Sequence, residues 1–209
     1  MKYAHTEQLH AEFRKKRSAV RRRLKEFRQI PRERYFYELI YCLMTPQSSA
    51  VNAGKAQQVF EAVAFRYNAV DPLPIVSDKR HYIRFHITKS ARISAVKLQY
   101  DEIDTLLQSS RSAAEKREWL VRHVNGFSMK EATHFLRNIG MNDGLAILDR
   151  HILKNLVYHN VIRTIPKTVT KKRYLFIEGR FRQFALRVSI TVDELDLLFW
   201  SREAGEILK

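Results

Sequence analysis

The stretch Leu120–Arg150, LVRHVNGFSMKEATHFLRNIGMNDGLAILDR, decides how the rest of the chain is interpreted. Gly126 permits a tight backbone turn that residues with a Cβ atom resist. Ser128 then stands three residues before Glu131, a capping-box spacing that predicts a helix from Met129. Apolar residues recur from there at helical spacing. The stretch therefore predicts a helix, a tight hairpin and a second helix.

Two titratable residues of this stretch fall at predicted helix starts. Lys130 lies in the first turn of the second helix, where the partial positive charge of a helix N-terminus favours a neutral, nucleophilic amine. Asp149 precedes an apolar helical pattern from Ile152 and is expected to cap that helix, whose dipole favours the ionised carboxylate. The pair is consistent with an amine and a carboxylate in one active site. A solvated surface lysine and a simple helix cap are the alternative.

Length and composition bound the class of protein. The chain of 209 residues suits one large domain or two small lobes, and it has no apolar run of the ~20 residues that span a bilayer. The first residues lack the apolar core of a signal peptide, so we expect a cytoplasmic, nucleoid-associated protein. The single cysteine, Cys42, excludes an internal disulfide and a four-cysteine zinc or iron–sulfur site. We expect a buried thiol, no metal and no cofactor.

The net charge of +16 is unevenly distributed. Residues 1–34 hold 12 Lys and Arg against 4 Asp and Glu, net +8, and the other 175 residues hold 26 against 18, also net +8. Such a surplus favours a polyanionic partner, because Lys and Arg neutralise phosphates and release counterions. A merely soluble basic surface is the alternative. The concentration of charge at the N-terminus favours nucleic acid, and the lack of a broad apolar face disfavours a membrane surface.

Helical periodicity continues through most of the chain. Capping boxes at Ser112 and Thr191 predict two further helix starts. The stretch 76–87, VSDKRHYIRFHI, alternates poorly, and we interpret it as an irregular loop that carries Phe85. No repeat and no convincing strand pair occurs, so the predicted fold is all-α. The other predicted helices cover about residues 6–29, 34–44, 53–67, 88–107, 149–160 and 171–188.

The combination of Gly126, Lys130 and Asp149 on a helix–hairpin–helix resembles the superfamily of helix–hairpin–helix DNA glycosylases. More closely, the segments LMTPQSS, MKEATHFLRNIG, LAILDRHILKNL and LDLLFW…LK resemble the type 2 8-oxoguanine DNA glycosylase/AP lyases. The resemblance covers about residues 34–209 and implies two helical lobes with a cleft between them. One is a barrel lobe that ends in the helix–hairpin–helix, residues 30–142, and the other is built from residues 1–29 and 143–209.

The resemblance implies a monomeric DNA repair enzyme that flips 8-oxoguanine out of double-stranded DNA and excises it. Lys130 attacks the deoxyribose C1′ and forms a Schiff base, Asp149 stabilises the positive charge on the sugar, and β-elimination then cleaves the abasic strand. Two alternatives stay open at this point. One is an endonuclease III-like glycosylase for oxidised pyrimidines, whose usual four-cysteine cluster is absent here. The other is a non-catalytic helix–hairpin–helix DNA-binding protein, which needs neither Lys130 nor Asp149.

Four residues are assigned to the flipped base and the duplex by the same resemblance. Phe85 and Trp200 match the aromatic pair that sandwiches the base, and Lys209 matches a C-terminal lysine that contacts it. Gln47 stands where related glycosylases place a wedge that fills the gap in the duplex. Without the resemblance, these would be core aromatics, a frayed terminus and an ordinary loop glutamine.

The hairpin residues are assigned to a DNA phosphate. Gly126, Phe127 and Ser128 occupy the turn whose backbone N–H groups grip the phosphate in the family. The family usually has two glycines around a hydrophobic residue, and Ser128 replaces the second one. Since serine is an acceptable N-cap, the helix start is expected to survive, with a weaker grip on the phosphate.

Overall fold

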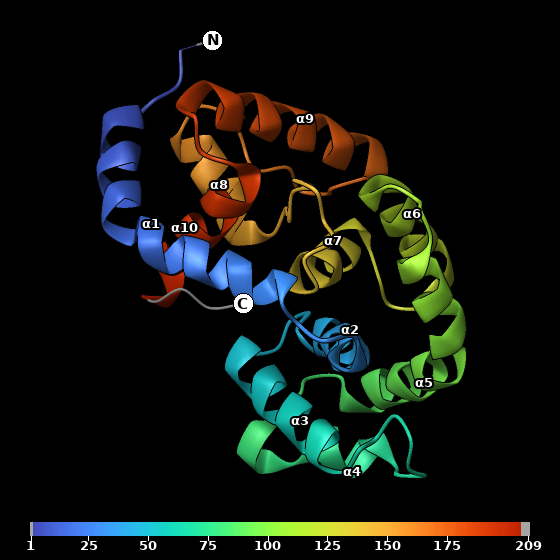
Figure 1. The fold of residues 1–209 in the computed structure, drawn as a ribbon. Helices are drawn as coiled ribbons and strands as arrows, with labels where there is room; N and C mark the ends of the chain where they lie inside the picture. The colour runs from blue at the N-terminus through green and yellow to red at the C-terminus, as the bar shows by residue number, and fades with distance from the viewer. Residues whose placement is uncertain (1, 206–209) are drawn as a thin grey trace. The chain divides into compact units, whose positions relative to one another are not determined.

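The computed structural model describes residues 2–205, and all regular elements within them are helical (Figure 1). The predicted all-α fold is therefore confirmed. None of the helices in this part of the chain combines the length and the apolar character needed to cross a bilayer. The helices are α1 (Thr6–Arg28), α2 (Tyr35–Met44), α3 (Ala50–Ala62), α4 (Pro72–Ser77), α5 (His86–Gln108), α6 (Ala113–His123), α7 (Met129–Asn138), α8 (Arg150–Tyr158), α9 (Lys171–Val188) and α10 (Val192–Ala204), with 3-10 turns at η1 (Arg32–Arg34) and η2 (Lys79–His81).

The chain divides into two compact units. The central unit is Ile30–Phe135, and the terminal unit combines Met1–Gln29 with Leu136–Lys209. The second break falls inside α7, so the first turns of that helix belong to the central unit and its end to the terminal unit. The boundary that the sequence predicts, at residue 142, lies beyond the end of α7.

The central unit is organised around α2. Every residue from Phe36 to Met44 is buried, as expected for a helix that is apolar on all sides. It packs against α3 and α5. Aromatic rings fill the contact, with the Phe36 ring edge-on to Tyr100 at a centroid distance of 5.1 Å. Cys42 is a buried cysteine outside any disulfide, as predicted.

Two local predictions in the central unit were wrong. Residues 76–87 are not one irregular loop, because Pro72–Ser77 forms α4 and η2 follows it. Asp71 caps α4 by accepting a hydrogen bond from the Leu73 N–H at 2.9 Å, and a proline at the first helical position gives up no needed donor. The α3 helix ends at Ala62 and not near residue 67 as predicted, so Tyr67 lies outside the helix and is 69% exposed.

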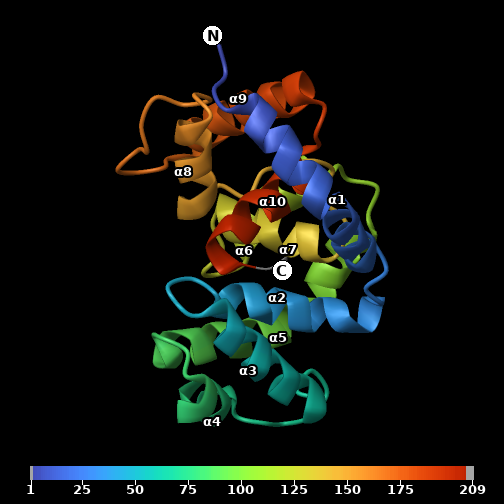
Figure 2. The same cartoon turned by 90° about the vertical axis from the view of Figure 1, so that its left-hand side faces the viewer.

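The terminal unit joins the two ends of the chain. Its first helix, α1, packs along α10, which also contacts α8 and α9 (Figure 2). The inward stripe of α1 consists of the buried residues Leu9, Phe13, Val20, Leu24 and Phe27, as its helical spacing predicts. Helix α10, which carries Trp200, is thereby held on several sides.

Candidate active site

The hairpin between α6 and α7 depends on Gly126. Its φ of +96° lies in the region that favours glycine. A Cβ atom at this position would come within 2.8 Å of the Arg92 side chain on α5. The Phe127 N–H closes the turn by donating to the Val124 carbonyl at 3.1 Å. The backbone conformation therefore favours glycine here, a Cβ atom would also push the Arg92 side chain aside, and the predicted tight turn is present.

The start of α7 places Lys130. The Glu131 carboxylate accepts a hydrogen bond from the Ser128 N–H at 3.2 Å and another from the Ser128 hydroxyl. The same hydroxyl oxygen accepts from the Lys130 N–H at 3.3 Å. Serine and glutamate thus fasten the first turn, as the capping-box spacing predicted. The Lys130 side chain is 28% exposed, and its Nζ lies 3.4 Å from Glu131 Oε1.

The N–H groups of Phe127 and Ser128 are both occupied inside the hairpin, by Val124 and by Glu131. The Phe127 ring is buried, with its centroid 6.3 Å from that of Phe135. Arg92 is the cation that lies directly against the turn, beside Gly126. Arg92 could not be singled out from the sequence, because nothing in the local pattern links it to a glycine so far along the chain.

Asp149 and Trp200 are brought together in the terminal unit. Asp149 caps α8, with Oδ1 accepting from the Ile152 N–H at 2.8 Å. Its Oδ2 accepts from the Trp200 Nε1–H, also at 2.8 Å. The Trp200 ring is edge-on to His151, with centroids 5.3 Å apart. Both oxygens of the carboxylate are therefore held, one by the backbone of α8 and one by a side chain of α10.

The segment before Asp149 is fastened by α9. The Tyr174 hydroxyl donates to the Ala146 carbonyl at 2.6 Å and accepts from the Leu148 N–H at 3.2 Å. Glu178 accepts from the Ala146 N–H at 2.8 Å. Because all of these groups are buried, each bond is shielded from water and its loss leaves an unsatisfied polar atom. The segment that leads to Asp149 is therefore attached to α9 by three buried hydrogen bonds.

Arg202 lies on α10, about half a helical turn after Trp200, and it fixes the position of this helix. Its guanidinium forms a two-pronged ion pair with Glu12 of α1, with Nη2 2.7 Å from Oε2 and Nε 3.2 Å from Oε1. It also donates to Asn155 Oδ1 of α8 and to His159 Nε2, the latter at 3.2 Å. One side chain therefore ties α10 to α1 and α8. No motif or spacing in the sequence indicates this role of Arg202.

His159 completes that arrangement as a neutral imidazole. Its Nδ1 lies 2.9 Å from the Ala4 carbonyl, and its ring is fully buried. Burial lowers the pKa of His159 to about 4, and the charge of Arg202 adds to that effect. The unfolded chain binds a proton at this residue near pH 6.5, whereas the folded chain resists protonation until about pH 4.

Acid is therefore expected to destabilise the fold through His159. Between pH 6.5 and 4 the unfolded state holds more protons, so the free energy of unfolding falls as the pH is lowered, by about 3 kcal/mol from this residue. Urea unfolding of the wild type and of His159→Gln across this range measures the effect. The wild type should lose stability relative to the variant. An equal fall in the unfolding free energy of the wild type and of His159→Gln would contradict the prediction. The matched control is His123→Gln, at the exposed end of α6.

Gln47 and Phe85 belong to neighbouring turns of the central unit. Lys89 of α5 donates from Nζ to the carbonyls of Met44 and Pro46, both at 2.7 Å, and to Ser48 Oγ at 3.1 Å. The same Ser48 oxygen accepts from the Arg84 N–H at 2.9 Å. The turn that carries Gln47 is thereby joined to the start of α5, where Phe85 lies. The lysine that makes this link was not singled out from the sequence.

Both side chains at these turns face outward. Gln47 is exposed and Phe85 is 53% exposed, and each has a φ near +60°, at 56° and 60°. A bulky residue in this region is uncommon and occurs when the surrounding structure imposes it. Because its side chain is exposed, Phe85 is not a core aromatic.

Lys89, the lysine that joins the two turns, has a lowered pKa. Burial lowers the pKa of Lys89 to about 8, assisted by the charges of Arg92, Arg84 and Lys130.

The predicted site residues thus fall into three local groups. The hairpin group is Gly126, Phe127, Ser128 and Lys130; the second group is Asp149 with Trp200; the third is Gln47 with Phe85. Lys209 lies outside the described residues, and its contact with the base stays a prediction.

The elements of residues 2–205 are all helical, and Gly126 closes a hairpin that is followed by a lysine in the first turn of the next helix. An aspartate caps a later helix. These are the features of the helix–hairpin–helix DNA glycosylases. A family model described as 8-oxoguanine DNA glycosylase matches residues 20–190. The chain belongs to this family. The family decides against both alternatives that the sequence left open.

Named relatives agree with the family match. The 8-oxoguanine DNA glycosylase/AP lyase of Fusobacterium nucleatum is 40% identical over 203 residues, which cover 92% of each chain. The crystal structure of the 8-oxoguanine DNA glycosylase of Thermotoga maritima superposes with a TM-score of 0.85, at 28% identity over 98% of each chain. The Methanocaldococcus jannaschii 8-oxoguanine glycosylase/lyase, in complex with a 15mer DNA containing 8-oxoguanine, has a TM-score of 0.84 at 28% identity, over 97% of this chain and all of that one.

Proposed function

We propose that the protein excises 8-oxoguanine from double-stranded DNA and then cleaves the abasic strand. The observation that carries this proposal is the partly exposed amine of Lys130 at the hairpin of a chain that belongs to the 8-oxoguanine DNA glycosylase family. The relative of M. jannaschii was crystallised with DNA containing this lesion, which supports DNA as the partner. The protein acts as a monomer, in the cytoplasm and on the nucleoid.

Lys130 supplies the nucleophile in this proposal. Its amine attacks C1′ of the damaged nucleotide, and the bond from C1′ to the base breaks as the base takes up a proton. Loss of a proton and opening of the sugar ring leave a Schiff base between Lys130 and C1′. Removal of a proton from C2′ then expels the 3′ phosphate, which cleaves the strand by β-elimination. The nearby Glu131 carboxylate is already engaged with Ser128, so it orients the turn rather than taking the proton.

Asp149 stabilises the positive charge that develops on the sugar and assists the proton transfers. Its carboxylate is held by the Ile152 N–H and by Trp200, so little reorganisation is needed when the charge appears. Phe85 and Trp200 hold the flipped base, and the 53% exposure of Phe85 supports that assignment. Lys209 contacts the same base.

Gln47 and the hairpin contact the duplex. Gln47 fills the gap that the flipped nucleotide leaves, which its exposed position on a fastened turn supports. Gly126, Phe127 and Ser128 contact a phosphate, with Arg92 beside them as a further positive charge. Because the N–H groups of Phe127 and Ser128 already have acceptors in the hairpin, the phosphate competes with Val124 and Glu131 for them.

A strand-cleavage assay tests the proposed function. Duplexes that differ only in one central base, 8-oxoguanine, thymine glycol or guanine, are incubated with excess enzyme, and nicked products are separated on a denaturing gel. We expect cleavage at 8-oxoguanine to be faster than at the other two. Equal or faster cleavage at thymine glycol would instead assign the protein to oxidised pyrimidines. If the protein bound the duplexes but cleaved none of them, the proposed enzymatic activity would be wrong.

The basic helix α1 adds contacts with DNA phosphates outside the lesion pocket. Two of its arginines serve the fold, since Arg21 pairs with Glu194 at 2.8 Å and Arg23 with Glu26 at 2.7 Å. Other cations on α1 are exposed and form no ion pair within residues 2–205: Arg14, Lys15, Arg17, Arg22 and Lys25. These side chains are free to neutralise phosphates.

Removing two of the exposed cations, Lys15 and Arg22, distinguishes a role of α1 in DNA binding from a role in the stability of the fold. Each phosphate contact contributes about −0.9 to the slope of log K against log salt, so Lys15→Gln with Arg22→Gln should flatten that slope by up to about 1.8. Binding to damaged and undamaged duplexes should weaken by similar factors, with the melting temperature unchanged. Arg21→Gln is the matched control and should melt earlier, because it leaves the mostly buried Glu194 without its partner. An unchanged salt slope in the double variant would remove α1 from the DNA interface.

A further inference from the structure

A second basic region follows α8, at the end of that helix opposite Asp149. Residues 161–182 hold seven Lys and Arg against one acidic residue, Glu178, and so carry a net charge of +6 out of the +8 of residues 35–209. Glu178 is buried and accepts a hydrogen bond from the Ala146 N–H, so the exposed charges of this region are all positive. Helix α8 has nine residues, so this region lies about 14 Å from Asp149 along the helix.

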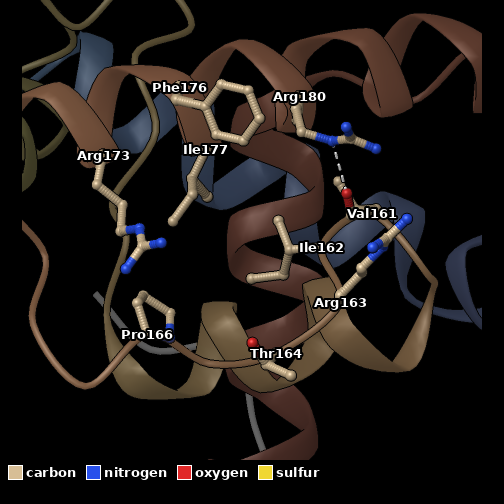
Figure 3. A pocket seen from close by; sticks show the side chains of 9 residues that line it. All are labelled: Val161, Ile162, Arg163, Thr164, Pro166, Arg173, Phe176, Ile177 and Arg180. Atoms are coloured by element: carbon tan, nitrogen blue, oxygen red, sulfur yellow. Dashed lines mark hydrogen bonds between the residues drawn. The ribbon is translucent and has the colours of Figure 1, made fainter.

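The region contains a pocket of about 360 Å³, which we call the connector pocket (Figure 3). Its floor is apolar, and three arginines surround it. The connector contributes Val161, Ile162, Arg163, Thr164 and Pro166, and α9 contributes Arg173, Phe176, Ile177 and Arg180. The pocket is close to the lower limit of the volumes that hold small ligands, which is too small for a duplex and suits a single planar group.

The side chains around the connector pocket are available to a ligand. Arg163 and Arg173 are exposed, and within the described part of the chain neither lies in an ion pair. Phe176 is 63% exposed, and the Arg180 guanidinium lies 5.9 Å from the centre of its ring. Arg180 itself is fixed by a hydrogen bond from Nε to the Val161 carbonyl at 2.8 Å. One wall is therefore rigid, while two guanidinium groups and an aromatic face remain open to solvent.

We propose that the connector pocket binds one unpaired nucleotide of a DNA strand, with its base against Phe176 and its phosphate between Arg163 and Arg173. Positive charge beside an exposed aromatic ring is the combination by which proteins bind single strands, because every base has a face that stacks. A duplex hides its base faces and would leave Phe176 unused. An acidic peptide would use the arginines but gains nothing specific from the aromatic face. The proposal concerns binding at a site separate from the excision chemistry and goes beyond it.

Binding of a short labelled oligothymidylate, followed by fluorescence anisotropy, tests this proposal on the full chain. Phe176→Ala should weaken binding by about fivefold or more, since stacking of a base on an aromatic side chain is lost. It should leave the salt slope unchanged. Arg173→Gln should flatten the slope by about 0.7, the value for one phosphate of a single strand. Neither variant should lower the melting temperature, because both side chains are exposed.

Two substitutions on the same helix serve as matched controls. Leu186→Ala removes an apolar side chain that is 80% exposed, and Arg187→Gln removes an exposed cation, both outside the connector pocket. Wild-type affinity of Phe176→Ala for the oligothymidylate would overturn the proposal. So would an effect of Arg187→Gln equal to that of Arg173→Gln, because binding would then be diffuse electrostatic attraction.

Competition by thymidine monophosphate distinguishes a free nucleotide from a strand as the natural occupant. The concentrations of thymidine monophosphate and of unlabelled oligothymidylate that displace the probe are compared, both counted per nucleotide. Similar concentrations would assign the pocket to free nucleotides. Displacement by the oligomer alone assigns it to a strand. The probe carries no lesion, so a failure of excision at 8-oxoguanine leaves this test intact, and a failure here leaves the proposed excision untouched.

Discussion

Lys130→Gln is expected to abolish the covalent adduct that borohydride traps between the protein and DNA containing 8-oxoguanine. Borohydride reduces a Schiff base to a stable amine, and glutamine has no amine that forms one. Single-turnover excision should fall by at least about 10³-fold, because the variant lacks the attacking group. Binding to the damaged duplex should change little, since Lys130 is partly exposed and Glu131 keeps its hydrogen bonds to Ser128 when the amine is removed.

The control for this experiment is Lys55→Gln, which removes an exposed lysine of α3 and should leave trapping at the wild-type level. Undiminished trapping in Lys130→Gln would place the nucleophile elsewhere in the chain. Loss of trapping together with an early melting transition would indicate a folding defect. For that reason thermal unfolding of each variant is recorded alongside the trapping gel.

Asp149→Asn is expected to reduce excision by about 10²- to 10³-fold, because it removes the charge that stabilises the cationic sugar. The fold should survive. Asparagine still caps α8 through its amide oxygen, since it ranks with aspartate at this position. Its amide nitrogen cannot accept the Trp200 N–H bond, and the loss of that one bond costs about 1 kcal/mol of unfolding free energy.

Trp200→Phe is the matched variant for Asp149→Asn. It removes the indole N–H and so breaks the same hydrogen bond, but it keeps the carboxylate of Asp149 and an aromatic ring. The two variants should therefore melt at similar temperatures while differing strongly in single-turnover excision. Equal activities would reduce Asp149 to a helix cap and structural partner of Trp200.

The helices and caps that the sequence predicted correctly depend on neighbouring residues. Ser112 with Glu115 and Thr191 with Glu194 both form complete capping boxes, because spacing alone decides whether the side chains meet the backbone. The cap at Asp149 follows the same rule. Tyr67 was misplaced since helical spacing was extended past Ala62, where the chain leaves α3 in a turn.

The residues that the sequence did not reveal are those whose partners lie far along the chain. Tyr174 fastens Ala146 from α9, and Arg202 meets Glu12 at the opposite end of the sequence. No periodicity connects such pairs, because packing brings them together only after the helices have formed. Lys89 is similar, since a buried lysine on the inner side of α5 contradicts the usual preference of lysine for the surface.

The position of the trapped adduct tests the central claim most directly. The wild-type protein is reduced with borohydride on a duplex containing 8-oxoguanine, digested with nuclease and a protease, and the peptide that carries the sugar remnant is sequenced by mass spectrometry. The claim predicts the remnant on Lys130, in the peptide that begins the helix after the hairpin. A remnant on any other lysine or on the N-terminal amine would contradict it.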